Sequence, residues 1–401
     1  MEAAFKRTFS SFEVRNFRLF FAGQCVSLCG TWMQIVGMSW LVLQLTHSGT
    51  QLGLVAAAQF LPVLLFGVIG GVIADRFDKR HVLFVTQTVA ALLSFALGAV
   101  VVAHAVQMWM VYVIAVGLGL TQTVDNPTRQ TFVMEMVGRE RLRNAVSLNS
   151  TMVNGARIIG PSIAGVLIAT VGIGPCFLVN AASFVAIIVG LAFMRVGELH
   201  RIPGAAPEPG QIRAGVRYVL GERRLRAILL MMFIVGIFAY EFPVALPLFA
   251  TTTLHGNAST YSALTVAMGI GAMAGGLYNA SRGQATLRRV FVTVVLFGCS
   301  MVLLAAMPNV VSACVVLFVV GVLSIWFIAL GNTTLQLTSD PHMRGRVMSL
   351  WAIAFFGTTP IGGPIIGYIG DHVSPRAGLL AGGLSAFVAA GVGYLVGRPK
   401  P

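Results

Sequence analysis

The chain has 401 residues, of which 57% are apolar and only 10% are charged, and its mean hydropathy is +0.85. Soluble domains are about 45–50% apolar and about 25% charged. A water-soluble monomer of this length cannot bury so much apolar surface, which excludes a soluble enzyme, a disordered chain and a disulfide-rich secreted domain. The sequence therefore predicts an all-α polytopic membrane protein.

Long apolar runs predict twelve membrane-spanning helices, because about 20 residues at a rise of about 1.5 Å each cross a hydrocarbon core of about 30 Å. Several runs contain Gly, Pro and polar residues, which the interior of a helical bundle tolerates. The expected spans are Phe17–Leu45, Leu52–Ala74, Val82–Ala103, Met108–Asp125, Ala145–Val171, Pro175–Met194, Leu225–Ala250, Thr260–Ala280, Val290–Met307, Val311–Gly331, Val347–Ile369 and Ala377–Val396.

The positive charges indicate the orientation of these spans. If both termini lie on one side, 25 of the 27 Lys and Arg residues fall on that side; Arg376 lies on the other side and Arg157 lies within a span. Such a bias marks the cytoplasmic face of a membrane protein. We therefore expect a multi-pass protein of the cytoplasmic membrane with both termini in the cytoplasm. The same bias accounts for the net charge of +14 without nucleic acid as a partner.

The longest cytoplasmic connection falls in the middle of the chain. It divides the sequence into an N-terminal six-helix bundle (1–195), a linker (196–224) and a C-terminal six-helix bundle (225–401). Within the linker, Gln211–Arg224 spaces Ile212, Val216 and Val219–Leu220 on one helical face, and its other positions are largely basic. This pattern favours a helix along the membrane surface over a plain linker, which remains the alternative.

An internal repeat supports two related halves. Ser147 and Ser349 are 202 residues apart within similar motifs, Gly160 and Gly363 are 203 apart, and Gly165 and Gly367 are again 202 apart. Because each half has an even number of spans, the halves are parallel repeats related by an axis along the membrane normal. A substrate site is then expected between them, near the membrane midplane.

The connection between the second and third spans combines a Gly-rich helix end with charges. Asp75 can meet the positive N-terminus of a neighbouring helix, while Arg76, Lys79 and Arg80 hold the loop on the cytoplasmic side. Short cytoplasmic loops are usually basic, which explains the cations. It does not explain why Gly70 and Gly71 are followed by an Asp-Arg pair.

Segment Gly71–Arg80 resembles the signature of the major facilitator superfamily, Gly-x-Leu-Ala-Asp-Arg-x-Gly-Arg-Lys. It departs from that signature at Ile73 and Asp78, and the corresponding Gly275–Arg289 of the second half lacks the acid. The resemblance implies the major facilitator fold. It also implies a gate that locks the outward-facing state, and here the gate motif is Gly71, Asp75, Arg76, Lys79 and Arg80.

The fifth span carries Gly155, Gly160, Pro161 and Gly165. Such spacing allows close contact between helices and a bend at the proline, and generic small-residue packing is the alternative explanation. The segment resembles the Gly-Pro motif of the exporter (antiporter) branch of the superfamily. Together with Asp125–Gln130, Arg143–Asn149 and Arg344–Leu350, it resembles the subfamily of enterobactin-exporter-like and drug efflux proteins.

Three ionisable residues within or beside the spans are candidates for proton coupling or substrate contact: Glu241, Asp125 and Arg157. A charge inside a span costs several kcal/mol unless it is paired, hydrated or neutralised. Each therefore also has a structural alternative: a stably neutral Glu241, an Asp125 paired with an arginine, and an Arg157 tied to a neighbouring helix. Possible cavity-lining residues are Gln34, Gln59, Trp40 and Asn180, each of which has a packing alternative.

These features together predict a secondary active transporter that exports a small amphipathic molecule, such as a drug-like compound or a siderophore, by alternating access with proton antiport. An importer or uniporter of a small metabolite on the same fold is the alternative. No nucleotide-binding loop, zinc-ligand spacing or nucleophile motif is found, so we expect no enzyme, no metal and no cofactor. The expected partners are the substrate, protons and lipid, and the expected state is a monomer.

Overall fold

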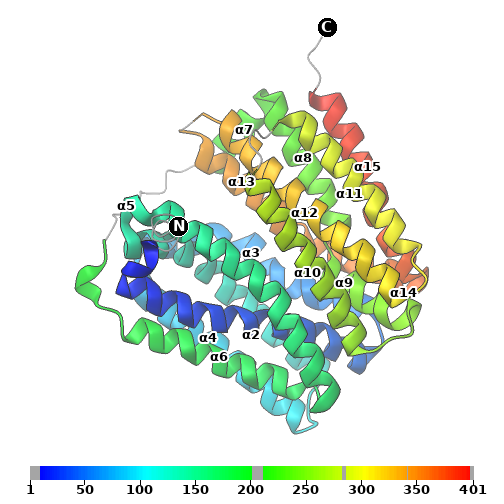
Figure 1. Ribbon diagram of the computed structural model, residues 1–401, viewed down its shortest axis with the longest axis horizontal. Helices are drawn as coiled ribbons and strands as arrows, with labels where there is room; N and C mark the ends of the chain where they lie inside the picture. The colour runs from blue at the N-terminus through cyan, green and yellow to red at the C-terminus, as the bar shows by residue number, and fades with distance from the viewer. Residues whose placement is uncertain (1–9, 201–210, 282–285, 341, 398–401) are drawn as a thin grey trace. The chain divides into compact units, whose positions relative to one another are not determined.

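The computed structural model describes residues 10–200, 211–281, 286–340 and 342–397, and this part of the chain is helical without strands (Figure 1). Its contacts form two units, Met1–Leu41 with Leu61–Ala206, and Val42–Phe60 with Pro207–Pro401. The first part of the chain forms η1 (Ser10–Glu13), α2 (Arg15–Thr46), α3 (Gly49–Arg76), α4 (Lys79–Val102), α5 (Met108–Thr170), α6 (Gly174–Ala192) and η2 (Val196–Glu198). The second part forms α7 (Gln211–Gly221), α8 (Arg223–Phe238), α9 (Phe242–Leu248), the π-helical turn η3 (Phe249–Thr253), α10 (Ala258–Ser281), α11 (Leu287–Ala305), α12 (Val310–Thr338), α13 (Arg344–Phe356), α14 (Thr359–His372) and α15 (Pro375–Gly397).

Among the described residues, eleven helical segments are long and apolar enough to cross a membrane. One of them, the 63-residue α5, is two helices joined at Gly138, whose φ of 70° and ψ of 178° are not helical. A positive φ is strained for residues with a Cβ, so glycine suits this break. Counted as two, α5 brings the total to the twelve spans predicted from sequence.

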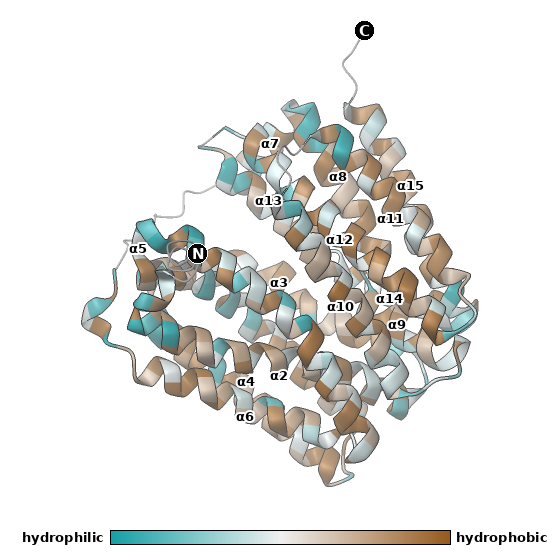
Figure 2. Ribbon diagram, viewed as in Figure 1, coloured by the Kyte–Doolittle hydropathy of each residue, from teal (hydrophilic) through white to brown (hydrophobic). Residues whose placement is uncertain are grey.

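The boundaries of α5 differ from prediction. The sequence predicts spans ending at Asp125 and starting at Ala145, with a connection between them, whereas helix continues on both sides of Gly138. The charged residues in this stretch mark where the apolar run ends, but they do not stop helical hydrogen bonding. Figure 2 shows hydrophilic residues gathered where the two parts of α5 join, beside its label, and along α7, and apolar residues along the spans.

Prolines explain why two other spans are interrupted. Span seven consists of α8 and α9, with Pro243 just after the break, and span eleven consists of α13 and α14, with Pro360 just after the break. A proline has no N–H to offer the carbonyl four residues earlier, and its ring clashes there. Each of these spans is therefore a discontinuous helix.

Glycines set the close helix contacts of the first unit. A Cβ at Gly70 of α3 would overlap the Thr123 carbonyl of α5, and a Cβ at Gly160 of α5 would overlap the Cys29 carbonyl of α2. Pro127 cannot donate to the Thr123 carbonyl, so this carbonyl lies free against Gly70. These helices touch backbone to backbone.

The second unit repeats these contacts between the corresponding spans. A Cβ at Gly271 of α10 would overlap the Phe318 carbonyl of α12, just as a Cβ at Gly70 would overlap the Thr123 carbonyl. A Cβ at Gly362 of α14 would overlap the Ile237 carbonyl of α8, much as Gly160 does with Cys29. Helices α4 and α6 pack together, and so do their counterparts α11 and α15. The predicted pair of six-helix repeats is thus seen in helix packing as well as in sequence.

The predicted surface helix of the linker is helical as α7, which packs on α8 and α13. Gly215 lies against Arg346, and the Tyr218 hydroxyl accepts the backbone N–H of Asp340 at 3.0 Å. These contacts fasten α7 to the start of α13 and to the connection that precedes it. The linker stretch 201–210 lies outside the described residues.

Candidate functional site

The gate motif divides into two parts with different surroundings. Asp75 and Arg76 at the end of α3 are exposed. Lys79 at the start of α4 is buried, and its Nζ lies 2.8 Å from Oε1 of Glu135 on α5, with both side chains 8% exposed. Arg80 donates to the carbonyls of Leu191 and Ala192 at the end of α6. Lys79 and Arg80 therefore hold the first unit together, while Asp75 and Arg76 remain accessible.

The departures of this motif from the family signature have local explanations. Asp78, which replaces a glycine, is the N-cap of α4 and accepts the His81 N–H at 3.1 Å, which satisfies a free donor of the first turn. The two glycines of the motif are not equivalent. Gly70 is pressed against α5, whereas a Cβ at Gly71 would meet nothing within 4 Å.

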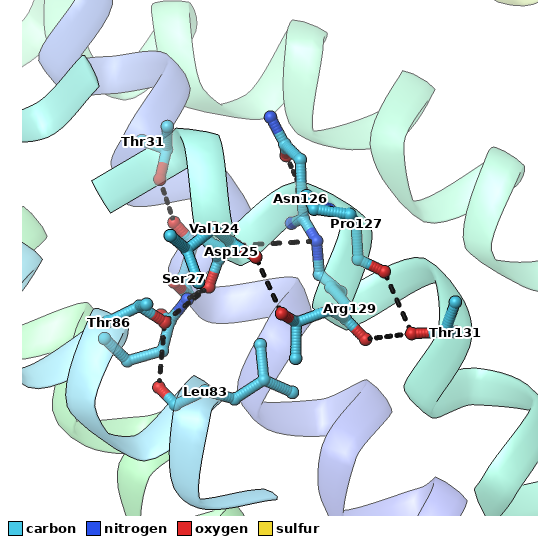
Figure 3. A network of polar contacts seen from close by, with 12 residues as sticks. Ser27, Thr31, Leu83, Thr86, Val124, Asp125, Asn126, Pro127, Arg129 and Thr131 are labelled. Carbon is cyan, nitrogen blue, oxygen red and sulfur yellow. Dashed lines mark hydrogen bonds and ion pairs between the residues drawn. The ribbon is translucent and has the colours of Figure 1, made fainter. Parts of the chain in front are cut away.

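Asp125 lies buried in a polar network between α4 and α5 (Figure 3). Its Oδ1 accepts from the Thr86 hydroxyl at 2.9 Å and from the Gln87 amide at 2.7 Å. Its Oδ2 lies 3.8 Å from Nε of Arg129, one turn further along α5. Asp125 thus accepts two hydrogen bonds on Oδ1 and faces a cation of the same unit on Oδ2, as expected of a carboxylate with a structural role.

Arg157 lies over an aromatic ring at the crossing of α5 and α2. Its guanidinium carbon is 5.0 Å from the centroid of Trp32, within the range of a cation–π interaction. Gly160, one turn along α5, contacts Cβ of Trp32 and so sets this approach. Pro161 removes the donor for the Arg157 carbonyl, which allows the helix to bend here.

The exporter motif provides a matched pair of glycines for a test. A Cβ at Gly160 would come within 2.6 Å of the Cys29 carbonyl oxygen, whereas a Cβ at Gly155 would meet nothing within 4 Å. We expect Gly160→Ala to destabilise the purified protein by about 2 kcal/mol through overpacking. Gly155→Ala should leave stability unchanged or raise it by up to about 1 kcal/mol, because alanine favours the helix over glycine. Melting curves in detergent measure both, and equal melting midpoints would contradict this packing. Gly165, the last glycine of the motif, is buried.

Glu241 lies where span seven is interrupted. It is the N-cap of α9, between the end of α8 and Pro243, and it is only 3% exposed. The Thr359 side chain at the start of α14 hydrogen-bonds its carboxyl group. Its Oε1 is buried without a hydrogen-bond partner. Gly362 and Gly363 of α14 line the carboxyl group, so two interrupted spans meet around one acid.

An aromatic cluster adjoins this acid. The ring of Tyr240 stacks on Phe297 with centroids 5.6 Å apart and meets the edge of Phe355 at 5.4 Å. The Tyr240 hydroxyl donates to the Ser324 carbonyl of α12 at 2.9 Å. These contacts hold the interrupted part of span seven against α11, α12 and α13.

Two of the four predicted cavity residues hydrogen-bond to each other. Asn180 of α6 donates to Gln34 of α2 at 2.6 Å, and both are buried, so their amides satisfy each other between two helices. Trp40 is 9% exposed and packs in the core, while Gln59 is partly exposed.

Sequence reasoning missed several partners in these sites: Thr86, Gln87 and Glu135 in the first unit, and Tyr240 and Thr359 in the second. The ion pair of Glu135 could have been anticipated, because an acid beyond the end of span four lies on the same side as the cation-rich connection between spans two and three. The hydroxyl and amide residues could not have been singled out, because such residues occur in most spans. Among the described residues, no group of three or more His, Cys, Asp or Glu is placed to hold a metal ion.

Two six-helix repeats with these motifs define a multi-pass membrane transporter of the major facilitator class. The chain belongs to the transmembrane secretion effector family of that superfamily, whose model matches residues 6–400. This confirms the superfamily and exporter-branch resemblance of the sequence motifs.

Named relatives span nearly the whole chain. The staphyloferrin A transporter of Staphylococcus aureus is 23% identical over 385 residues, which cover 95% of this chain and 96% of the relative. The multidrug efflux pump Tap of Mycolicibacterium fortuitum is 27% identical over 363 residues, covering 88% of each chain. The enterobactin exporter EntS of Shigella flexneri is 24% identical over 382 residues, covering 93% of this chain and 89% of the relative.

Solved structures share the fold. A bacterial homologue of the lysosomal transporter Spinster, in an inward-facing and unoccupied conformation, has a TM-score of 0.76 at 14% identity and covers 97% of this chain and 99% of that chain. The nucleoside transporter NupG also has a TM-score of 0.76, at 11% identity, and covers 96% of this chain and 100% of that chain.

Proposed function

We propose that this transporter is a proton-coupled exporter that moves small amphipathic molecules out of the cytoplasm by alternating access. The names of its relatives, which refer to siderophores and drugs, support the export direction and the substrate class. The observation that carries the coupling is Glu241, an acid buried at the junction of two interrupted spans with one carboxyl oxygen unpartnered. Interrupted helices are where many transporters bind substrates and coupling ions.

Glu241 suits proton binding better than Asp125. A proton on Oε1 of Glu241 neutralises a carboxyl group that has a single hydroxyl partner, Thr359. A proton on Asp125 would remove the charge that faces Arg129 and would weaken the two hydrogen bonds that Oδ1 accepts from Thr86 and Gln87. In our proposal Asp125 fixes α4 against α5, and Glu241 releases its proton when its surroundings become hydrated. Proton and substrate are then coupled through one conformational change.

The other charged candidates have separate roles in this proposal. Arg157, presented on the face of Trp32, is a candidate contact for an anionic part of a substrate. Asp75 and Arg76 are the mobile members of the gate motif, because they are exposed and carry no restraint comparable to that of Lys79. The proposed gate closes when these two residues gain partners at the cytoplasmic face.

The test of this function is accumulation in inside-out membrane vesicles with an acidified lumen. A panel containing staphyloferrin A, enterobactin and amphipathic drugs is offered from outside, which corresponds to the cytoplasm. We expect at least one compound to accumulate and to leak out when the pH gradient is collapsed. Equal accumulation with and without the pH gradient would contradict proton coupling. Transport of every active compound only down its concentration gradient would favour a uniporter.

The proposed orientation is tested by labelling single cysteines. Phe77 and Ala105 are both exposed and lie at opposite ends of α4, on the sides predicted to be cytoplasmic and external. In a background without the native cysteines, we expect a membrane-impermeant thiol reagent to label Ala105→Cys in intact cells. Phe77→Cys should react only after lysis. The reverse pattern would invert the orientation and with it the direction of transport.

A further inference from the structure

Asp371 at the end of α14 receives an unusual number of hydrogen bonds for an exposed carboxylate. Its Oδ2 accepts from the Ser48 hydroxyl at 2.7 Å and from the Thr50 backbone N–H and hydroxyl, both at 2.8 Å. Its Oδ1 accepts from the Gly49 backbone N–H. Four donors from three consecutive residues thus converge on one side chain, which lies 321 to 323 positions away in the sequence.

These donors belong to the first turn of α3, where the backbone N–H groups have no helical partner. A carboxylate placed there satisfies two of them and also interacts favourably with the positive end of the helix dipole. Hydrogen bonds to an ionised group are stronger than neutral ones. Asp371 therefore caps α3 from another helix, alongside Ser48, whose hydroxyl accepts the Gln51 N–H at 3.3 Å.

Glycines bring the two helices together below this cap. A Cβ at Gly367 of α14 would overlap the Gly49 carbonyl, and a Cβ at Gly53 of α3 would overlap the Gly363 carbonyl one turn further on. The contact consists of two backbones at two successive levels. Because no long side chains interdigitate at this surface, α3 and α14 can separate and pack together again without repacking side chains.

The position of this contact in the chain suggests its function. Residues Val42–Phe60, the connected ends of α2 and α3, belong by their contacts to the second unit, while the remainder of both helices belongs to the first. Alternating access requires the two six-helix repeats to separate on one side at a time. Any such separation on the predicted external side must detach this α2–α3 tip from α14.

We propose that Asp371 and residues 48–50 form an external latch, which holds the transporter closed toward the outside and opens in each cycle. This inference rests on the alternating access of the proposed function but not on its substrate or its coupling ion. The glycine pairs Gly49–Gly367 and Gly53–Gly363 form the surface that the latch closes, and Asp371 sets the balance between the two states.

The test measures the separation of the tip from α14 directly. Spin labels on Leu45 and Val373, two exposed residues on either side of the contact, report the distance in purified protein without native cysteines. We expect Asp371→Asn, which keeps the size of the side chain but removes its charge, to raise the population with the longer distance about tenfold. Such a factor corresponds to about 1.4 kcal/mol.

Arg376→Gln is the matched control, because it removes a charge from the start of α15, where Arg376 donates to the Met307 carbonyl and not to α3. It should leave the distance distribution unchanged. An unchanged distribution in Asp371→Asn, or an equal shift in both variants, would overturn the latch. Because no substrate is present, a failure here is distinct from a failure of proton-coupled export.

A crosslink provides the second measurement. The Ser48 and Asp371 side chains are in direct contact, so cysteines at both positions should form a disulfide or react with a short bifunctional reagent. We expect the crosslinked protein to lose transport at least tenfold and a reductant to restore it to the level of the uncrosslinked double variant. Undiminished transport in the crosslinked protein would show that this contact does not open during the cycle.

Discussion

Glu241→Gln should abolish concentrative export while the protein still exchanges substrate across the membrane. The amide keeps the size of the side chain and the Thr359 contact but cannot release a proton. A pH difference of one unit supplies about 1.4 kcal/mol per proton, enough for about a tenfold concentration ratio. In inside-out vesicles, we therefore expect accumulation to fall to equal concentrations on the two sides. Counterflow of labelled against unlabelled substrate should persist.

Asp125→Asn is the matched comparison, because it is the same change of acid to amide in another span. It disturbs the Thr86 and Gln87 hydrogen bonds, so it should lower the melting temperature of the protein. The remaining folded protein should still respond to the pH gradient. If Glu241→Gln retains gradient-driven accumulation and Asp125→Asn loses it, the proton site belongs to the first unit and our assignment is wrong.

Breaking the buried Lys79–Glu135 pair should have the largest effect on stability. Lys79→Met leaves the Glu135 carboxylate buried without its cation, and loss of one partner of such a pair costs about 3 kcal/mol or more. We expect a marked fall in the melting temperature in detergent and in the yield of folded protein. The double variant Lys79→Met with Glu135→Leu removes both charges and should recover most of the loss.

Glu198→Gln is the control for this prediction. It removes the acid from the exposed Arg195–Glu198 pair of the same unit, whose side chains are 64% and 44% exposed, and such pairs contribute less than about 1 kcal/mol. A Lys79→Met variant as stable as Glu198→Gln would mean that water reaches Glu135. A double variant no better than the single one would assign the loss to packing instead of charge.

The sequence was sufficient to predict the spans and their duplication, because both depend on composition and spacing. It failed at residues 126–144, where a drop in hydropathy was interpreted as a connection although helix continues to Gly138. Hydropathy reports where lipid ends, whereas helices end where backbone conformation changes. The glycine that makes this change was not separable, in sequence, from the other 44 glycines.

The sites were predictable as residue types but not as partnerships. Glu241, Asp125 and Arg157 stand out because charges are rare inside spans. Which of them has hydrogen-bond partners depends on neighbours such as Thr86 and Thr359, and nothing in the sequence distinguishes those residues from other threonines. Asp371 does not stand out in the sequence, because charged residues are ordinary at the end of a span. Its donors lie more than 300 positions away, beyond any local pattern.

The second half of α5 is held at two levels by the N-terminal part of the chain. The Asn144 side chain accepts the Ser11 N–H at 3.0 Å, and 16 residues later Gly160 lies against Cys29. The helix must therefore keep a fixed distance and a fixed rotation angle between the contact at Asn144 and the contact at Gly160. One inserted residue would rotate one contact residue about the helix axis by about 100° and shift it by about 1.5 Å relative to the other. An insertion of two full turns would restore the rotation angle but would shift the contact residue by about 10 Å. Insertions or deletions between Asn144 and Gly160 therefore have no neutral length, whatever residues they contain.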